Sequence, residues 1–224
     1  MISQIQVGEQ QLPQGSTFGN QRGGRQADTI ISQLHGKYYE QNFNGNLYCF
    51  GLSNTALVSA NAIATGLTAT AQPVIGIYNP LSSGKNVSIL QAIINTTTVA
   101  NTAVSPGGFM WVYSIGNANL VTTGSNGLNC KSMVADQASG VKCYAISTAL
   151  TGLVNSLAVL RCAAMNSVNA AGPATAISQA TNNPLELVDG SIIVPPGGVV
   201  GIMNQVSTTT VSCSVGIMYE IIPA

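Results

Sequence analysis

A Gly-Lys pair, Gly84-Lys85, precedes an apolar run, and this arrangement is one element of a phosphate-binding loop. The full loop needs a glycine five positions before the paired glycine and a Ser or Thr after the lysine, because backbone N–H groups and a hydroxyl must surround the phosphates and their Mg²⁺. The chain has Asn79 and Asn86 at these positions. The following residues, NVSILQAIIN, are rich in β-branched side chains, whereas the loop should open a helix. We therefore interpret Lys85 as a solvent-facing turn residue between two strands.

His35 is the only histidine, so any Ser-His-Asp triad would depend on it. No Gly-x-Ser-x-Gly segment, which would expose a nucleophilic serine, occurs in the chain. His35 precedes Gly36 at the edge of a polar N-terminal segment, where a general base would be poorly preorganised. We interpret His35 as structural, and we expect no enzymatic activity and no cofactor.

The spacing of the possible metal ligands does not fit a metal site. Zinc needs Cys or His ligands at short spacing, and the five cysteines are far apart: Cys49, Cys130, Cys143, Cys162 and Cys213. Their odd number and the lack of a CxxC pattern predict reduced, mostly buried thiols. Calcium needs clustered carboxylates. The only close acidic pair, Glu186 and Asp189, is interpreted as flanking a turn.

Residues 1–33 are rich in Gln, Gly and Asn and hold few large apolar side chains, which predicts an extended N-terminal arm. Arg22 and Arg25 in QRGGRQ are the only clustered cations. Two guanidiniums on an arm can pair with carboxylates of a neighbouring molecule, and a solvated tail is the alternative. Phe18 is the third candidate partner-binding residue, beside Arg22 and Arg25. A single RGG-like copy is a weak signal for nucleic acid, so we expect no nucleic-acid partner.

The composition limits the function classes further. Charged residues make up 6% of the chain and the net charge is zero, against about 25% charged residues in a typical domain. At 46% apolar residues the chain is not of disordered composition. No apolar run reaches the ~18 residues of a spanning helix, so we expect no membrane partner. Because soluble monomers usually keep more surface charge, we infer that other copies or a partner cover much of the surface.

Short apolar runs separated by Gly, Pro, Asn or Ser follow from residue 34 onward, which is typical of a β-sandwich or barrel. In residues 211–221 apolar and polar or small side chains alternate with a period of two, which predicts a half-buried strand. Residues 55–71 and 146–165 are Ala-rich. Each could hold a helical turn, and for residues 146–165 we favour a strand-loop-strand region. Trp111 lies in an apolar run, so we expect it to be buried.

Pro-Gly-Gly precedes an apolar run twice, within residues 105–112 and 195–202. Proline presets φ and glycine allows the positive φ of a tight turn. The two copies mark either related hairpins in two sheets or two ordinary β-turns, and the second interpretation is the simpler one.

Several segments resemble a group of tailed-bacteriophage virion proteins. The resemblance rests on HGKYYE (35–40), on Gly45-Asn46, on YNP (78–80) followed by GKN (84–86), and on GSIIVPPGGVVGI (190–202) with the closing strand. It covers about half of the chain, and its motifs are turn and strand signatures. It offers no catalytic residues to carry over.

The resemblance implies an all-β protein: a jelly-roll β-sandwich over residues 34–224 with an extended N-terminal arm over residues 1–33. Within the group we favour a capsid cement (decoration) protein that binds the major capsid protein, self-associates as a homotrimer and reinforces the exterior of the head. The N-terminal MISQIQ lacks the basic and apolar regions of a secretion signal, and we expect assembly in the host cytoplasm. The alternatives are a tail or receptor-binding fibre module and a carbohydrate-binding β-sandwich.

Overall fold

The computed structural model describes residues 36–63, 67, 71–99, 107–118, 124–136, 138–146, 150–169, 179–182, 185–207 and 211–223. The chain divides into two units, residues 1–37 and 38–224. Phe18, Arg22, Arg25 and His35 lie outside the described residues. The arm predicted for residues 1–33 therefore stays a prediction.

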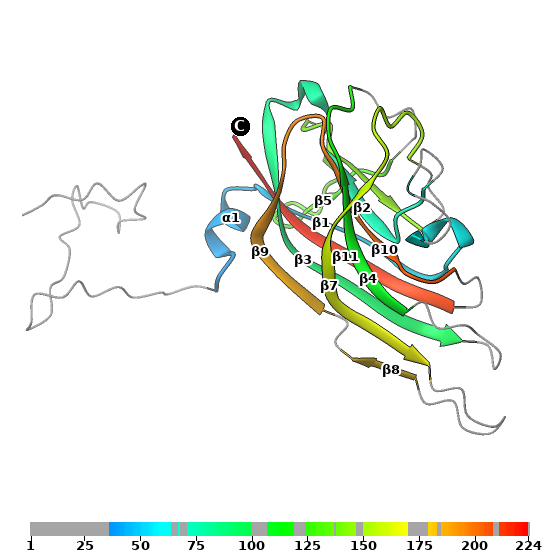
Figure 1. Cartoon of the computed structure of the whole chain (residues 1–224). Helices are drawn as coiled ribbons and strands as arrows, with labels where there is room; N and C mark the ends of the chain where they lie inside the picture. The colour runs from blue at the N-terminus through cyan, green and yellow to red at the C-terminus, as the bar shows by residue number, and fades with distance from the viewer. Residues whose placement is uncertain are drawn as a thin grey trace, which may run out of the picture. The chain divides into compact units, whose positions relative to one another are not determined.

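Two antiparallel sheets form the second unit, and this confirms the predicted all-β class and β-sandwich (Figure 1). One sheet has five strands in the order β5-β1-β11-β3-β9, and the other has six in the order β6-β2-β10-β4-β7-β8. The elements are α1 (Tyr39–Phe43), β1 (Leu47–Ala56), the 3-10 turn η1 (Ser59–Asn61), β2 (Ile75–Tyr78), the 3-10 turn η3 (Leu81–Ser83), β3 (Lys85–Val99), β4 (Gly107–Ser114), β5 (Leu128–Asn129), β6 (Lys142–Ala145), β7 (Ala158–Asn169), β8 (Gln179–Asn182), β9 (Leu185–Val194), β10 (Val199–Asn204) and β11 (Val211–Pro223).

The strand pairs are nested along the chain. β1 pairs with β11, β2 with β10, β3 with β9, and β4 with β7, all antiparallel. From β1 to β4, and again from β9 to β11, successive strands alternate between the two sheets. The short strands β5, β6 and β8 extend the edges beside β1, β2 and β7. The chain therefore folds like one long hairpin that is wrapped into two layers.

The closing strand β11 lies between β1 and β3 and supplies much of the core. Every second side chain is buried between the sheets: Val211, Cys213, Val215, Ile217, Tyr219 and Ile221. The side chains between them stay partly exposed on the outer face. This confirms the half-buried strand that the alternation predicts. Trp111 on β4 faces the same core and is fully buried, as expected.

Loops cover the outer face of the six-stranded sheet and form a second apolar cluster with it. The cluster joins residues of four strands to residues of the loops: Ala71, Tyr78, Val112, Tyr144, Leu150, Leu157, Val199 and Met203. The backbone N–H of Leu150 donates to the carbonyl of Ala71 at 3.1 Å, so the two loops support each other. Residues 55–71 contain a helical turn, η1, which is the alternative left open for them, whereas the described part of residues 146–165 is loop followed by β7, in agreement with the favoured interpretation.

Asn61 holds these loops in place. Its side chain is fully buried, accepts from the backbone N–H of Val58 at 2.7 Å, and donates to the carbonyls of Gln72 at 2.6 Å and Ile146 at 2.8 Å. Ile146 has a φ of 47°, which is unfavourable for a β-branched residue. The bond from Asn61 and two bonds from the Ile146 N–H to Pro73 and Val74 fix this conformation.

The turn motifs that carry the resemblance contact one another. The backbone of Asn79 exchanges hydrogen bonds with Gly197 and Gly198 of the second Pro-Gly-Gly turn, at 2.8 and 2.9 Å. The Asn79 side-chain amide donates to the carbonyls of Lys85 at 2.7 Å and Val194 at 3.0 Å. Gly84 is left-handed, with a φ of 59°, and Lys85 begins β3. Gly84 therefore belongs to the turn between β2 and β3, as predicted, whereas Lys85 is already the first, partly exposed residue of β3 and not a turn residue.

The two Pro-Gly-Gly segments precede neighbouring strands of one sheet. Gly107 begins β4, and β10 begins at Val199. These strands pair directly, from Val199 opposite Ser114 to Asn204 opposite Phe109. The possibility that the segments mark hairpins in two different sheets is therefore wrong, because both strands belong to the six-stranded sheet.

A pair of glycines lies opposite each other on the outer face of each sheet. In the six-stranded sheet, Gly76 pairs with Gly201, and Pro73 fills the space above them: a Cβ built on Gly201 would lie 2.9 Å from the Pro73 Cβ. In the five-stranded sheet, Gly51 pairs with Gly216. A Cβ on Gly216 would meet only the carbonyl oxygen of Phe50, at 3.9 Å. Among the described residues, nothing fills this second notch.

The difference between the two glycine pairs predicts opposite responses to an added methyl group. Gly201→Ala should lower the free energy of unfolding by about 1–3 kcal/mol, because the methyl group would overlap the rigid ring of Pro73. Gly216→Ala should leave the stability unchanged or raise it by up to about 1 kcal/mol, because it stiffens the unfolded chain without a clash. Urea unfolding of both variants measures the difference. Equal midpoints for the two variants would contradict the assignment of Pro73 as the filling group.

Candidate functional site

Glu186 is the buried carboxylate that joins the two sheets. It lies on β9, the edge strand of the five-stranded sheet, and is 5% exposed. Across the gap lies β7 of the six-stranded sheet, which β8 covers only from Asn166 to Asn169. The more N-terminal part of β7 therefore has a described strand partner, β4, on one side only.

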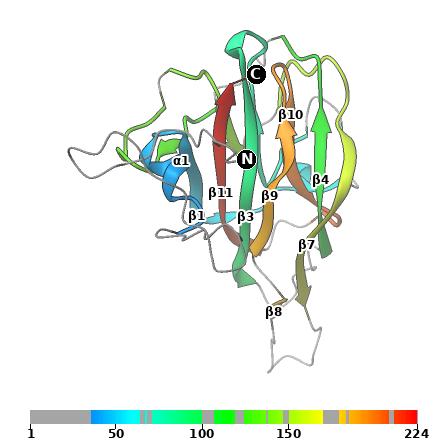
Figure 2. The same ribbon diagram turned by 90° about the vertical axis from the view of Figure 1, so that its left-hand side faces the viewer.

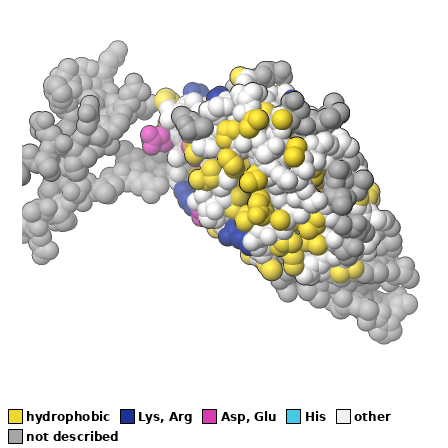
Figure 3. Space-filling view, turned by 45° about the horizontal axis from the view of Figure 1, so that its top comes forward, with side chains coloured by type: hydrophobic (Ala, Val, Ile, Leu, Met, Phe, Trp, Pro, Cys, Tyr) yellow, Lys and Arg dark blue, Asp and Glu magenta, His cyan; other side chains and the backbone are white. Residues whose placement is uncertain are grey.

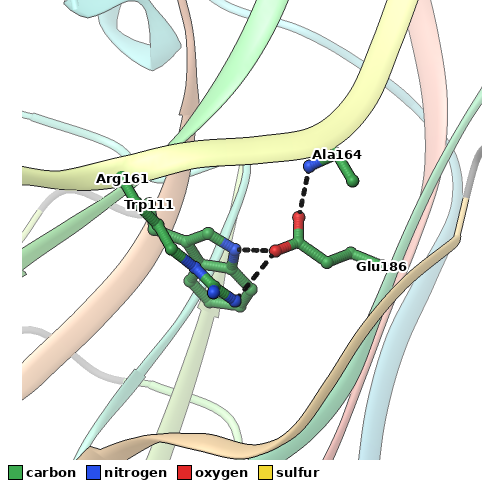
Figure 4. Close-up of polar contacts among 4 residues, drawn as sticks. All are labelled: Trp111, Arg161, Ala164 and Glu186. Carbon is green, nitrogen blue, oxygen red and sulfur yellow. Dashed lines mark hydrogen bonds and ion pairs between the residues drawn. The ribbon is translucent and has the colours of Figure 1, made fainter.

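Three donors from the other sheet hold this carboxylate (Figure 4). One oxygen, Oε1, accepts from Trp111 Nε1 at 2.9 Å and from Arg161 Nη2 at 3.1 Å. The other, Oε2, accepts from the backbone N–H of Ala164 at 2.8 Å. A buried charge is tolerated only when it is paired and hydrogen-bonded, and this arrangement meets both conditions.

A pocket lies beside the ion pair, between β7 and β9. It has a volume of about 590 Å³ and is lined by Arg161, Cys162, Ala163, Ala164, Leu185, Glu186 and Leu187. Most of this lining is apolar, and its one carboxylate is already bound by three donors. The geometry suits a structural clamp between the sheets better than acid or base chemistry, which needs a carboxyl group free to exchange a proton with a substrate.

The sequence interpretation of Glu186 was wrong in one respect. Glu186 and Asp189 do not flank a turn between elements, because both lie within β9, with Asp189 at a left-handed φ of 50°. The signal for the clamp was present in the sequence: in an alternating strand, Glu186 shares its face with the buried Val188. A carboxylate on a buried face needs donors from another element.

A second buried polar cluster joins β6 to β11. The thiol of Cys143 lies 3.7 Å from the Tyr219 hydroxyl, and the Tyr219 ring stacks on Tyr48 with ring centres 5.6 Å apart. Burial, only partly offset by the hydrogen bond to Tyr219, raises the pKa of Cys143 to about 12. Gly127 must be glycine here, because a Cβ would lie 2.1 Å from the Tyr219 hydroxyl oxygen. The thiol is therefore protonated and packed, and it does not have the low pKa of a nucleophilic cysteine.

All five thiols are free, as predicted, but they differ in exposure. Cys143 and Cys213 are buried, and burial raises the pKa of Cys213 to about 12 as well. Burial, together with the neighbouring Cys49, raises the pKa of Cys130 to about 11. Cys162 is exposed at the rim of the pocket, so the expectation of mostly buried thiols holds for only part of the set.

Within the described residues, no group of three His, Cys, Asp or Glu side chains could hold a metal ion. None of the described helices is long and apolar enough to cross a membrane.

The outer face of the five-stranded sheet is exposed along the middle of β11, β3 and β9, and residues 38–46 with α1 lie against one end of it (Figure 2). We call it the open face and define it by the outward side chains of β11, β3 and β9 around the Gly51–Gly216 notch. Leu187 and Ile193 of β9 are 61% and 55% exposed, and Ile93 of β3 is 38% exposed. The outward residues of β11 from Ser212 to Ile222 are all partly exposed. This contrasts with the six-stranded sheet, whose outer face is covered by loops.

The candidate partner-binding residues Phe18, Arg22 and Arg25 remain outside the described residues, so the structure does not bring them to either site. Comparison with known protein families and with curated proteins finds no match for the chain. The bacteriophage resemblance therefore rests on the motifs alone.

Removal of the Glu186 carboxylate should destabilise the sandwich. Glu186→Ala should lower the free energy of unfolding by about 2–4 kcal/mol, because the Trp111 and Ala164 donors lose their buried acceptor. Glu186→Gln should cost less, because its amide oxygen can still accept from one of them. Urea unfolding followed by tryptophan fluorescence reports directly, since Trp111 is the only tryptophan. A Glu186→Ala midpoint equal to wild type would show that the clamp contributes nothing.

The thiols should react in the order of their exposure. In the native protein, iodoacetamide should label Cys162 first and leave Cys143 and Cys213 unmodified, because burial and a pKa near 12 remove the reactive thiolate. In urea all five should be labelled. Peptide mass spectrometry measures the sites, and fast native labelling of Cys143 would contradict the packing around Tyr219.

Proposed function

We propose that this chain is a structural subunit of a tailed-bacteriophage particle, a cement (decoration) protein that binds the exterior of the capsid and reinforces it. The observation that carries the proposal is the uncovered, charge-poor apolar surface of an otherwise complete sandwich. Figure 3 displays one such face, on which hydrophobic side chains cluster and charged side chains are few. Contiguous apolar surface of this kind marks protein interaction sites.

The nested strand pairing supports the proposal. We interpret the pairs β1–β11, β2–β10, β3–β9 and β4–β7 as a jelly roll, in which eight strands of two Greek keys form two four-stranded sheets. β5, β6 and β8 are additions at its edges. This architecture occurs in viral capsid proteins and also in lectins, so the fold alone does not determine the function.

The position of Trp111 favours the capsid protein over the carbohydrate-binding alternative. Sugar sites usually present an exposed aromatic ring; the only tryptophan of the chain is fully buried beneath Glu186, so among the described aromatic side chains only rings such as Tyr39 and Tyr113 could serve. The contacts of the phage-like motifs support a structural role in the same way. Asn79, Gly197 and Gly198 bind one another and shape a turn.

The cement proposal predicts binding to heads and a dependence on the N-terminal residues. The purified chain should sediment with cognate expanded heads that lack tails, in hundreds of copies per particle, and as a symmetric oligomer, a homotrimer, when free. Deletion of residues 1–33 should abolish head binding and leave the sandwich folded, as judged by the fluorescence of Trp111. Binding to tails alone would overturn the cement role in favour of a tail or fibre module.

A further inference from the structure

The open face carries an empty notch and a carboxylate in a fixed relation to each other. The notch is formed by Gly51 and Gly216, and Glu220 lies four residues further along β11 on the same face. Leu187, Gln91 and Met218 form the cross-strand row between them. In the six-stranded sheet the equivalent notch is filled by Pro73 from a loop. The five-stranded sheet lacks such a group among the described residues.

Glu220 is a carboxylate without a described cation. No described Lys or Arg forms a salt bridge with it, and burial against its neighbours raises the pKa of its carboxyl group. Its cross-strand neighbours are Leu47 and Ser88, which are 5% and 6% exposed. A cation supplied from outside the sheet would compensate this partly desolvated charge.

The N-terminal residues join the described structure beside this face. The Tyr38 hydroxyl donates to Asp189 of β9 at 2.5 Å, and Gly190, the next residue of β9, lies against Ser88. Tyr38, close to the start of the described residues, therefore lies near Ser88, which pairs with Glu220. Residues 10–27 of the N-terminal segment carry two cations, Arg22 and Arg25, and no anion.

We propose that the open face binds residues 18–25 of a second copy of this chain, with Phe18 in the notch between Gly51 and Gly216 and Arg22 paired with Glu220. The segment lies extended over β11, and neighbouring copies are linked by their N-terminal residues. The inference rests on the proposed function only in requiring that copies of the chain assemble.

The spacing of the two partners agrees. Phe18 and Arg22 are four residues apart, as are Gly216 and Glu220. In an extended chain a four-residue step covers roughly 13 Å and returns the side chain to the same face. Both side chains of the segment therefore reach their partners at once. Gly23 and Gly24 then allow Arg25 to turn toward the end of the sheet where Asp189 lies.

The length of the N-terminal segment favours a second copy over the chain's own face. Asp189 lies on β9, and Glu220 on β11, with only β3 between them. Two strand spacings amount to roughly 10 Å, which a few residues would span. The 13 residues between Arg22 and Gly36 can extend up to roughly 45 Å, which is more than the chain's own face requires and is enough to reach another molecule.

Exchange of the charges tests the pairing in the full-length chain. Variant one carries Arg22→Glu and Arg25→Glu, and variant two carries Glu220→Lys. Each variant alone should associate roughly tenfold or more weakly than wild type in sedimentation velocity, because like charges then meet at the contact. An equimolar mixture of the two should recover association, since each segment then finds an opposite charge on the other variant.

Two matched controls separate this contact from unfolding and from general surface effects. Gly216→Leu should weaken association by filling the notch, while Ser82→Leu, an exposed position in η3, should not. Glu40→Lys, an exposed carboxylate in α1, should leave association unchanged. Trp111 fluorescence checks that each variant is folded, and Gly216→Leu keeps the test decisive if Glu220→Lys does not fold.

Three results would overturn the inference. The first is a wild-type chain that stays monomeric, and the second is a variant one that associates like wild type. The third is an equimolar mixture that stays dissociated, since each segment should then find an opposite charge on the other variant. Head binding by the same variants keeps the proposals apart. Variants that fail to associate but still bind heads would show that head binding does not require the copies to assemble. Charge-dependent association without head binding would support this inference and exclude the cement role.

Discussion

The period of two along β11 fixes what both faces of the five-stranded sheet present. Six buried side chains commit one face to the core, so the other face must carry Ser214, Gly216, Met218 and Glu220. A slip of one residue would reverse every side chain. Because β11 pairs with both β1 and β3, its register also determines that Gly51 lies beside Gly216 and that Ser88 lies beside Glu220. The core and the open face are therefore two results of one alternation.

Buried polar side chains hold together elements that strand pairing does not join. Glu186 joins the edges of the two sheets, Asn61 holds the loops over the six-stranded sheet, and Asn79 holds the turn beside β10. Each makes more than one hydrogen bond, so each position tolerates little substitution. In this chain, in which 6% of the residues are charged, two of these three junctions are made by side-chain amides and only one uses an ion pair.

The sequence predicts features whose cause is local. The alternation in β11, the turn at Gly84 and the burial of Trp111 each follow from neighbouring residues. The partners of the junctions lie far away in the chain: Glu186 is 75 residues from Trp111, and Asn79 is 115 residues from Val194. Gly51 and Gly216 likewise meet only through the pairing of β1 with β11. The alternation around Glu186 indicates a buried carboxylate that needs donors, but a single sequence does not show that Trp111, Arg161 and Ala164 supply them or that Gly51 meets Gly216.

The nested pairing also limits the order in which the strand pairs can form. The innermost pair, β4 with β7, can form early in synthesis, but β11, the middle strand of the five-stranded sheet, is made after all the other described strands. Contacts of such long sequence separation form slowly, and the sheet stays divided, with β1 apart from β3, until β11 has been made. The notch and Glu220 do not exist as a surface before that moment. A nascent chain without β11 would thus be unable to receive a neighbour, and only subunits with the complete sheet would enter an assembly.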